Sequence, residues 1–199
     1  ARTIYRNNIS QNLIKKLNPK IIFFIFWSKK IHKNIYTNNL CIQFHCSNLP
    51  NFRGGSPVQN QILHGLKKTK ISAFRVDNKI DAGDICLKKN LSLRGSANII
   101  YERIEKTAIS MINKLVKKKN INFTKQKGKG KFYRRRKKED SNLISSNYPK
   151  IERVYNFIRM LDAENYPKAF LNLQRYMIEF KNAKLKNNEI RGEFKIFKK

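Results

Sequence analysis

The sequence predicts an α/β protein, and three observations lead to this fold class. Residues 21–27 (IIFFIFW) are apolar throughout, as in a strand of a parallel sheet that helices cover on both faces. Residues 40–44 repeat that pattern in a shorter run. Residues 97–118 carry isoleucines and leucines at helical spacing, which predicts a long amphipathic helix. Because strand and helix patterns alternate between these landmarks, a sheet with packed helices is expected.

The other elements follow from shorter patterns of the same two kinds. Helices are expected where apolar residues recur every three or four positions, at residues 9–17, 29–36, 59–66 and 151–161. Strands are expected at residues 71–76, 85–91, 169–173, 177–185 and 190–197. The last three strands lie close together after the final helix, so the chain is expected to end in a small β-rich part.

The charge of the chain is strongly positive. Among 199 residues, 44 are Lys or Arg and 13 are Asp or Glu, which gives a formal net charge of +31. Clustered cations are typical of proteins that bind nucleic acid, because they release counterions from phosphates. The lysines are spread along a chain that is also crowded with Asn and Ile, so a compositional bias explains the same charge. Both interpretations remain open at this point.

Three cysteines, Cys41, Cys46 and Cys86, bear on the redox environment and on metals. They are odd in number and have no paired spacing, so neither a disulfide framework nor a metal site is expected. Free thiols fit a reducing, cytoplasmic location. The apolar run 21–27 is far shorter than the roughly 18 residues that span a bilayer, so membrane insertion is not expected.

Residues 41–61 (CIQFHCSNLPNFRGGSPVQNQ) hold the first candidate catalytic group. His45 stands at the end of the strand predicted at 40–44, before a turn and a Gly-Gly loop. Gln43 precedes it by two positions, so both side chains point to the same side of the strand. A carboxamide can donate to a carbonyl oxygen that gains negative charge, and an imidazole can do the same or relay a proton.

An acidic turn at residues 81–84 (DAGD) supplies the third group. The carboxylate of Asp81 can orient the imidazole or take a proton from an attacking amine. Amide, imidazole and carboxylate together suit acyl transfer to a nitrogen nucleophile. Since no Ser or Cys stands in the usual pattern of an activated nucleophile, direct transfer between two bound substrates is favoured over a covalent acyl-enzyme.

These motifs resemble the signature of the 10-formyltetrahydrofolate-dependent formyltransferases. The resemblance rests on residues 44–50 (FHCSNLP), then 53–57 (RGGSP), then 80–85 (IDAGDI), in that order. It extends over about residues 21–115. Residues 134–167 are similar to the C-terminal part of the methionyl-tRNA members of the family.

The resemblance implies a Rossmann-like sheet and a formyl group delivered from 10-formyltetrahydrofolate to an amine, without a metal. By position it implies that His45 is the catalytic imidazole and Asp81 the carboxylate. Gln43 stands where the family has Asn, and it keeps the amide one methylene further out. The folate contacts implied by the same resemblance are Trp27, Val76 and Asp77.

The expected domain organisation has three parts. Residues 1–119 form the catalytic domain, N-terminally incomplete because the family's first βα units are absent from the sequence. Residues 120–132 form a flexible basic linker, and residues 133–199 form a small helix-plus-β domain. The cluster at 134–138 (RRRKK) fits either a solvated loop or a phosphate clamp.

The sequence bears less directly on which molecule carries the amine that accepts the formyl group. The Phe-His motif and the sequence after Arg53 look most like the formyltransferases of surface-sugar pathways, so the main prediction is a nucleotide-linked amino sugar of polysaccharide biosynthesis. Methionyl-tRNA, which suits the positive charge, is the alternative. A non-catalytic basic module that binds nucleic acid is a second alternative. Whether the chain forms a homo-oligomer is left open.

Overall fold

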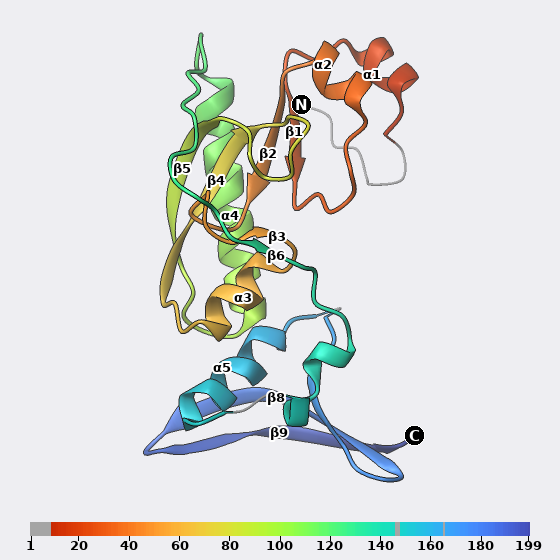
Figure 1. Cartoon of the computed structure of the whole chain (residues 1–199), viewed down its shortest axis with the longest axis vertical. Coiled ribbons are helices and arrows are strands. Elements are labelled where there is room, and N and C mark those ends of the chain that lie inside the picture. Colours follow the sequence, from red (N-terminus) through yellow and green to blue (C-terminus); the bar gives the residue numbers. More distant parts are fainter. Residues whose placement is uncertain (1–8, 146–147, 165) are drawn as a thin grey trace.

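The computed structural model describes residues 9–145, 148–164 and 166–199, and it confirms the α/β class (Figure 1). A mixed four-stranded sheet, in the order β1-β2-β4-β5, is the centre of the larger part. A three-stranded sheet, in the order β7-β8-β9, is the centre of the smaller part below it in the figure. Among the described residues, no helix is both long and apolar enough to cross a membrane.

The expectation of a parallel sheet holds for one strand pair and is wrong for the others. β1 (Ile22–Ile25) and β2 (Cys41–His45) are parallel, joined through a short helix. β4 (Lys68–Arg75) is antiparallel to β2, and β5 (Ile85–Ser92) is antiparallel to β4. The link from β4 to β5 is a short turn without a crossover helix, and such a link can join only antiparallel neighbours.

Burial separates the two strands that were predicted to be covered on both faces. β2 fits the prediction, since Ile42 is fully buried. β1 does not fit it: Phe24 is buried, whereas Ile25 is 40% and Phe26 is 37% exposed. The physical reason is position, because β1 is the edge strand of the described sheet and Phe26, just past its end, lines an open cleft.

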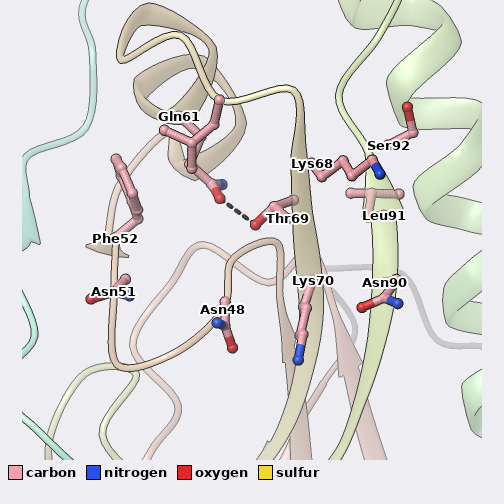
Figure 2. Close-up of a pocket in the computed structure, with 11 residues that line it drawn as sticks. Asn48, Asn51, Phe52, Gln61, Lys68, Thr69, Lys70, Asn90, Leu91 and Ser92 are labelled. Carbon is pink, nitrogen blue, oxygen red and sulfur yellow. Dashed lines mark hydrogen bonds between the residues drawn. The ribbon is translucent and has the colours of Figure 1, made fainter.

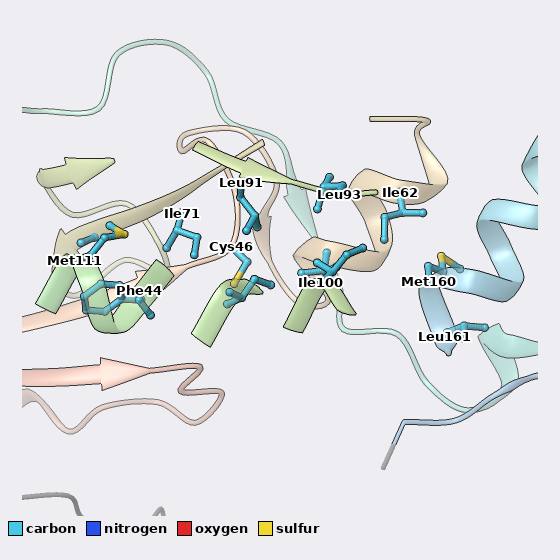
Figure 3. Close-up of a cluster of buried hydrophobic side chains, with 14 of the residues drawn as sticks. Phe44, Cys46, Ile62, Ile71, Leu91, Leu93, Ile100, Met111, Met160 and Leu161 are labelled. Carbon is cyan, nitrogen blue, oxygen red and sulfur yellow. The ribbon is translucent and has the colours of Figure 1, made fainter. Parts of the chain in front are cut away.

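The long helix α4 (Ala97–Val116) packs on one face of this sheet. Ser96 caps it, because its hydroxyl accepts a hydrogen bond from the Ile99 N–H at 3.5 Å. Figure 3 shows side chains of the helix, the strands and α5 together in one apolar cluster. The buried stripe of the helix is Ala97, Ile100, Ile104, Ala108, Met111 and Leu115.

Three shorter helices complete the larger part of the molecule within the described ranges. α1 (Gln11–Leu17) and α2 (Lys33–Asn38) bury Ile14 and Ile35 in a second apolar cluster beside Phe24 of β1. The second of these helices begins four residues later than predicted, and Lys29 and Lys30 border the cleft instead. α3 (Pro57–Leu63) follows the Gly-Gly loop with proline in its first turn.

The C-terminal part has the elements that the sequence predicts, one helix and three strands. The β8–β9 hairpin turns at Asn187 and Asn188, which have φ values of 48° and 59°, the left-handed pair that a two-residue hairpin loop requires. Phe157 and Leu161 of the helix pack in one cluster with Ala169 and Phe180 of the sheet. The bounds are α5 (Ile151–Leu161), β7 (Ala169–Asn172), β8 (Tyr176–Lys186) and β9 (Glu189–Lys198).

The segment expected as a flexible linker is instead attached along the larger part. Thr124 exchanges backbone hydrogen bonds with Ile85 at 2.8 and 2.9 Å. Further on, β6 (Phe132–Tyr133) pairs in parallel with β3 (Arg53–Gly54) in the loop after His45. Two 3-10 turns follow, Glu139–Ser141 and Leu143–Ser145. The domain boundaries at 119 and 132 stay a prediction, but this stretch is in contact with the folded chain.

Candidate active site

A cleft of about 580 Å³ opens beside the ends of β1 and β2, and residues 76–81 of the link between β4 and β5 line it as well. β1 and β2 are parallel neighbours, so the residues at and just after their ends lie at the same edge of the sheet (Figure 1). All six residues singled out from the sequence line this cleft: Trp27, Gln43, His45, Val76, Asp77 and Asp81. The structure therefore brings the candidates together, while their chemical roles remain predictions.

His45 is buried, with 6% of its surface exposed, and both its ring nitrogens face a partner. Nε2 lies 2.7 Å from the carbonyl oxygen of Phe52. A carbonyl only accepts, so Nε2 carries the proton and the ring orientation is fixed. Nδ1 lies 3.4 Å from Oδ2 of Asp81, a distance typical of an ion pair rather than of a short hydrogen bond.

Asp81 is held in a strained turn. Its φ is 52°, in the left-handed region, where Asp is one of the few residues that fit without a large penalty. Its Oδ2 accepts a hydrogen bond from the Gly54 N–H at 2.8 Å. The turn also requires Gly83, because a Cβ there would lie 1.8 Å from the Arg75 carbonyl oxygen. The loop after His45 and the turn after β4 are thus joined through one carboxylate.

Gln126, in the stretch predicted as a linker, also holds the turn that contains Asp81. Its Nε2 donates to the carbonyl oxygens of Asp81 at 2.9 Å and Gly83 at 2.8 Å. Its Oε1 accepts from the Arg53 guanidinium at 2.7 Å. Sequence reasoning missed this residue, since a glutamine among lysines carries no local signal of its role.

Gln43 is less firmly held than His45. Its Nε2 donates to the Trp27 carbonyl oxygen at 3.4 Å, which is near the limit of a hydrogen bond. The amide is half-buried and borders the cleft on the same strand as His45. A weakly engaged donor of this kind can turn to a carbonyl group brought into the cleft.

The residues expected near the donor form the opposite wall. The Trp27 ring packs edge-on against Phe24, with ring centroids 5.4 Å apart. Val76 is buried in the same apolar cluster. Asp77 caps the next turn, since its Oδ1 accepts from the Lys79 N–H at 2.8 Å. These residues combine two apolar side chains with one carboxylate, and Lys29, Lys30 and Lys79 also line the cleft.

Other cleft residues were not found from the sequence. Tyr101 comes from α4, and its hydroxyl accepts from Gln59 Nε2 at 2.8 Å. Burial raises the pKa of Tyr101 to about 12, so the hydroxyl stays protonated at neutral pH. A tyrosine next to the buried stripe of a helix is the signal that would have indicated a polar tip near a cavity.

The basic cluster at 134–138 divides among different roles. Arg134 is exposed and forms a two-point contact with Asp140 at 2.6 and 2.7 Å, and its guanidinium lowers the pKa of Asp140 to about 2. Arg135 lines the cleft. Arg136 places its guanidinium over the Phe157 ring, 5.6 Å from the centroid. Neither a solvated loop nor a phosphate clamp describes the whole cluster.

Cys46 lies directly behind His45. It is buried, and burial raises the pKa of its thiol to about 12, so the thiol stays protonated and is no activated nucleophile. The cysteines are free thiols. In the described ranges, no three His, Cys, Asp or Glu side chains are grouped as metal ligands would be.

The features described so far define an α/β protein whose cleft combines an amide, an imidazole and a carboxylate, a set suited to acyl transfer to nitrogen. Comparison with known proteins identifies the family: residues 2–116 match the sequence model described as formyl transferase, and the chain belongs to that family. Residues 138–197 match the model described as methionyl-tRNA formyltransferase, C-terminal domain.

Individual relatives agree with this placement. The structure of methionyl-tRNA formyltransferase from Clostridium thermocellum is 41% identical, with a TM-score of 0.92, over 98% of this chain and 86% of that one. Methionyl-tRNA formyltransferases of Rickettsia prowazekii and Buchnera aphidicola are each 30% identical, over 83% and 73% of this chain. The chain spans 63% of the length of the former and 50% of the latter.

The comparisons correct the predicted acceptor. A 4-N formyltransferase from Francisella tularensis shares only 15% identity, with a TM-score of 0.68, which is a likeness of fold alone. The relatives with 30% identity or more are methionyl-tRNA enzymes, so the prediction of an amino-sugar nucleotide and of polysaccharide biosynthesis is wrong. The incorrect prediction rested on residues 44–57, a short part of the chain.

Proposed function

We propose that the chain transfers a formyl group from 10-formyltetrahydrofolate to the amine of methionyl-tRNA. The observation that carries this proposal is the 41% identity with the Clostridium thermocellum methionyl-tRNA formyltransferase over nearly the whole chain. The paired His45 and Asp81 in the cleft support it independently, since such a pair suits proton transfer.

The cleft fits a folate donor in shape and chemistry. Its volume of about 580 Å³ lies in the range of small-molecule sites. The apolar wall around Trp27 and Val76 suits a flat aromatic ring system, and the weakly held Gln43 amide lies on the side of the reacting group. When bound, the folate would supply the formyl carbon: the bond from the amine to this carbon would form, the bond from N10 would break, and N10 would take up a proton as tetrahydrofolate leaves.

We assign the chemical steps to three side chains. Gln43 Nε2 donates to the carbonyl oxygen as negative charge develops there. Asp81 takes the proton that the attacking amine loses, on Oδ1, for which the described residues provide no hydrogen bond while Oδ2 is held by Gly54. His45, fixed by Phe52, lies 3.4 Å from Oδ2 through Nδ1 and keeps the carboxylate in place.

The acceptor end enters through the mouth of the cleft in this proposal. Arg135 and Tyr166, from the C-terminal half of the chain, line the cleft together with Tyr101. A guanidinium and aromatic hydroxyls suit the phosphates and ribose of an RNA terminus. The net charge of +31 favours association with a polyanion of this size.

The test is tetrahydrofolate release from 10-formyltetrahydrofolate in the presence of methionyl-tRNA, with uncharged tRNA and an amino-sugar nucleotide as parallel acceptors. We expect turnover with methionyl-tRNA and none with the others. His45→Ala should remove it, while His32→Ala, at an exposed ring that does not line the cleft, should leave it unchanged. A folded chain that turns over none of the acceptors would refute the proposal.

A further inference from the structure

A second hollow, of about 550 Å³, lies beside the first and contains none of the groups assigned to transfer. It exists because β4 is longer than β2. β2 ends at His45 opposite Ser72, while β4 begins at Lys68, so four residues of β4 have no partner strand on that side. Figure 2 shows the loop from Asn48 to Phe52 and the helix residue Gln61 across from them. We call this hollow the lysine groove.

Backbone groups of β4 face the lysine groove. The Lys67 carbonyl accepts from the Leu93 N–H at 3.0 Å, so it points to β5. Backbone groups alternate sides along a strand, and the N–H and C=O of Lys68 and Lys70 therefore point to the open side. The floor of the lysine groove thus offers amide donors as well as side chains.

The charge of the lysine groove is positive without compensation. Lys68 and Lys70 line it, and Lys88, opposite Ser72 on β5, lies beside it with Nζ 2.8 Å from Asn48 Oδ1. No carboxylate lines the groove, and none of these three lysines is in an ion pair with a described residue. The Lys70 ammonium adds to the effect of burial in lowering the pKa of Lys88, as expected for crowded cations.

Leu66 and Leu91 make part of the lining apolar, and several of the other lining groups donate hydrogen bonds or stack. Asn48 Oδ1 is occupied by Lys88, which leaves its Nδ2 as the free donor. Figure 2 shows Lys70 between the carboxamides of Asn48 and Asn90, with Phe52 on the far wall. The Thr69 hydroxyl donates to Gln61 and closes the inner end.

We infer that the lysine groove binds a nucleotide through its phosphate, held by Lys70 and the Asn48 amide, with Lys68 adding positive charge from the side of Ser92 and with the base against Phe52. Crowded ammonium groups gain most from a bound anion, and the aromatic wall distinguishes a nucleotide from a simple ion. A cation is excluded by charge. The open edge is two outward-facing residues long, which is short for a peptide that adds a strand.

The position of the lysine groove suggests where the nucleotide comes from. The Phe52 ring stacks on Tyr133, with centroids 5.0 Å apart, and Tyr133 lines the cleft on the other side. One aromatic pair therefore separates the two hollows, and an RNA strand that leaves the cleft can continue into the lysine groove. A free nucleotide has the same chemistry, so the test separates the two sources.

The first measurement is binding of a fluorescein-labelled RNA tetranucleotide by anisotropy at several salt concentrations. The variant is Lys68→Gln with Lys70→Gln. Its matched control is Lys67→Gln with Lys89→Gln, which removes the same charge from neighbouring lysines outside the lysine groove. We expect the first pair to weaken binding about tenfold and to lower the salt slope by about 1.4, at about 0.7 per lost phosphate contact on a single strand.

The control pair, Lys67→Gln with Lys89→Gln, should change neither the affinity for the tetranucleotide nor the salt slope by more than a small fraction. Equal weakening by both pairs would show that binding follows net charge alone and would overturn the inference. All four lysines are on the surface or half-buried, and melting curves check that each variant is folded. Because the readout is binding, a failure here is distinct from a failure of formyl transfer.

The second measurement titrates adenosine 5′-monophosphate and inorganic phosphate into the isotope-labelled protein. We expect the side-chain amide signals of Asn48, Asn51 and Asn90 to shift. If the mononucleotide binds as tightly as the tetranucleotide, the ligand is a free nucleotide, and if the tetranucleotide binds far more tightly, it is a strand. No shift with any of these probes, or displacement of RNA by an uncharged β-forming peptide, would overturn the inference.

Discussion

The active-site cleft and the lysine groove both begin where β2 ends, and they hold their polar groups in opposite ways. In the cleft, the imidazole and the carboxylate have fixed partners: His45 with Phe52 and Asp81, and Asp81 with Gly54. In the lysine groove, Lys68 and Lys70 form no ion pair with any described residue. The cleft is arranged before a substrate arrives, whereas the lysine groove gains its order from a ligand.

This difference tells which measurement suits each hollow. Pre-arranged groups lower the barrier of a reaction and are detected by rates, since their geometry costs nothing at the moment of reaction. Uncompensated charges raise affinity and are detected by salt dependence.

The largest effect is expected at the carboxylate of the cleft. Asp81→Asn keeps an oxygen for the Gly54 N–H and suits the left-handed backbone, so the fold should survive. It removes the proton acceptor, and kcat/KM for formyl transfer should fall by roughly 10²–10⁴-fold. Steady-state kinetics on folded protein checks this prediction.

The matched control for that carboxylate is Asp84→Asn. Asp84 is in the same turn but does not line the cleft. It should retain the rate of the unchanged protein within a factor of about two. If both substitutions lowered kcat/KM equally, the loss of rate would come from a disturbed turn and not from the missing Asp81 carboxylate.

A large loss of stability is expected at the turn that positions Asp81. Gly83→Ala would place a Cβ 1.8 Å from the Arg75 carbonyl oxygen, so the backbone must move. We expect the free energy of unfolding to fall by about 3 kcal/mol, as measured in urea. Gly65→Ala, with φ +77° and no atom within 4 Å, should cost roughly 1 kcal/mol for strain alone.

A smaller effect, dependent on pH, is expected at Tyr101. Its folded pKa of about 12 lies above the ordinary value near 10, so the unfolded chain loses this proton first as the pH rises. The contribution of the protonated Tyr101 hydroxyl to the free energy of unfolding is fully present below pH 10 and is lost as the pH rises toward 12. Tyr101→Phe should therefore reduce the decline of stability by about 1 kcal/mol at pH 11.

The check on Tyr101 is a set of urea curves from pH 8 to pH 11. Only the slope against pH is compared, because losing the hydroxyl also removes a partner of Gln59 at every pH. Tyr176→Phe, at a side chain that is 49% exposed, should leave the slope unchanged. Equal slopes for Tyr101→Phe and the unchanged protein would contradict the prediction.

The smallest effect is expected in the lysine groove. Lys70→Gln should raise the pKa of Lys88, because the Lys70 ammonium now helps to lower it. Lys89→Gln removes a charge from the other face of β5, where Nζ donates to Ser110, and should have less effect. Nuclear magnetic resonance of the lysine side-chain carbons measures both values. An unchanged pKa of Lys88 in the Lys70→Gln variant would mean that the two ammonium groups do not affect one another.

Local patterns predicted the elements well and their arrangement less well. The final helix, Ile151–Leu161, has the bounds that its apolar spacing predicts. The sense of β4 and β5 could not be read from their composition, because it depends on the link between them. The exposure of Ile25 could not be read from an apolar run either, since the same residues suit a central strand and an edge strand.

In the cleft, too, local sequence patterns revealed some of the residues, whereas others depend on how the chain folds. His45, Gln43 and Asp81 were found because strand ends and turns leave a trace in sequence. Tyr101 and Gln126 come from a helix face and from a lysine-rich stretch, and only folding brings them near Asp81 or into the cleft. The acceptor was predicted wrongly from the motif beside His45, and the identity with methionyl-tRNA enzymes over most of the chain corrected it.

The stretch between the two matched regions, residues 117–137, limits how the chain can be divided. A protein cut after residue 119 would keep His45 and Asp81 but would lose Gln126, which supports the Asp81 turn, and Tyr133, whose carbonyl accepts from the Gly55 N–H at 2.8 Å. The two halves are therefore not interchangeable modules. A chimaera that exchanges C-terminal parts between relatives has to place its junction after Tyr133, so that Gln126 and Tyr133 stay with the turn and the loop that they support.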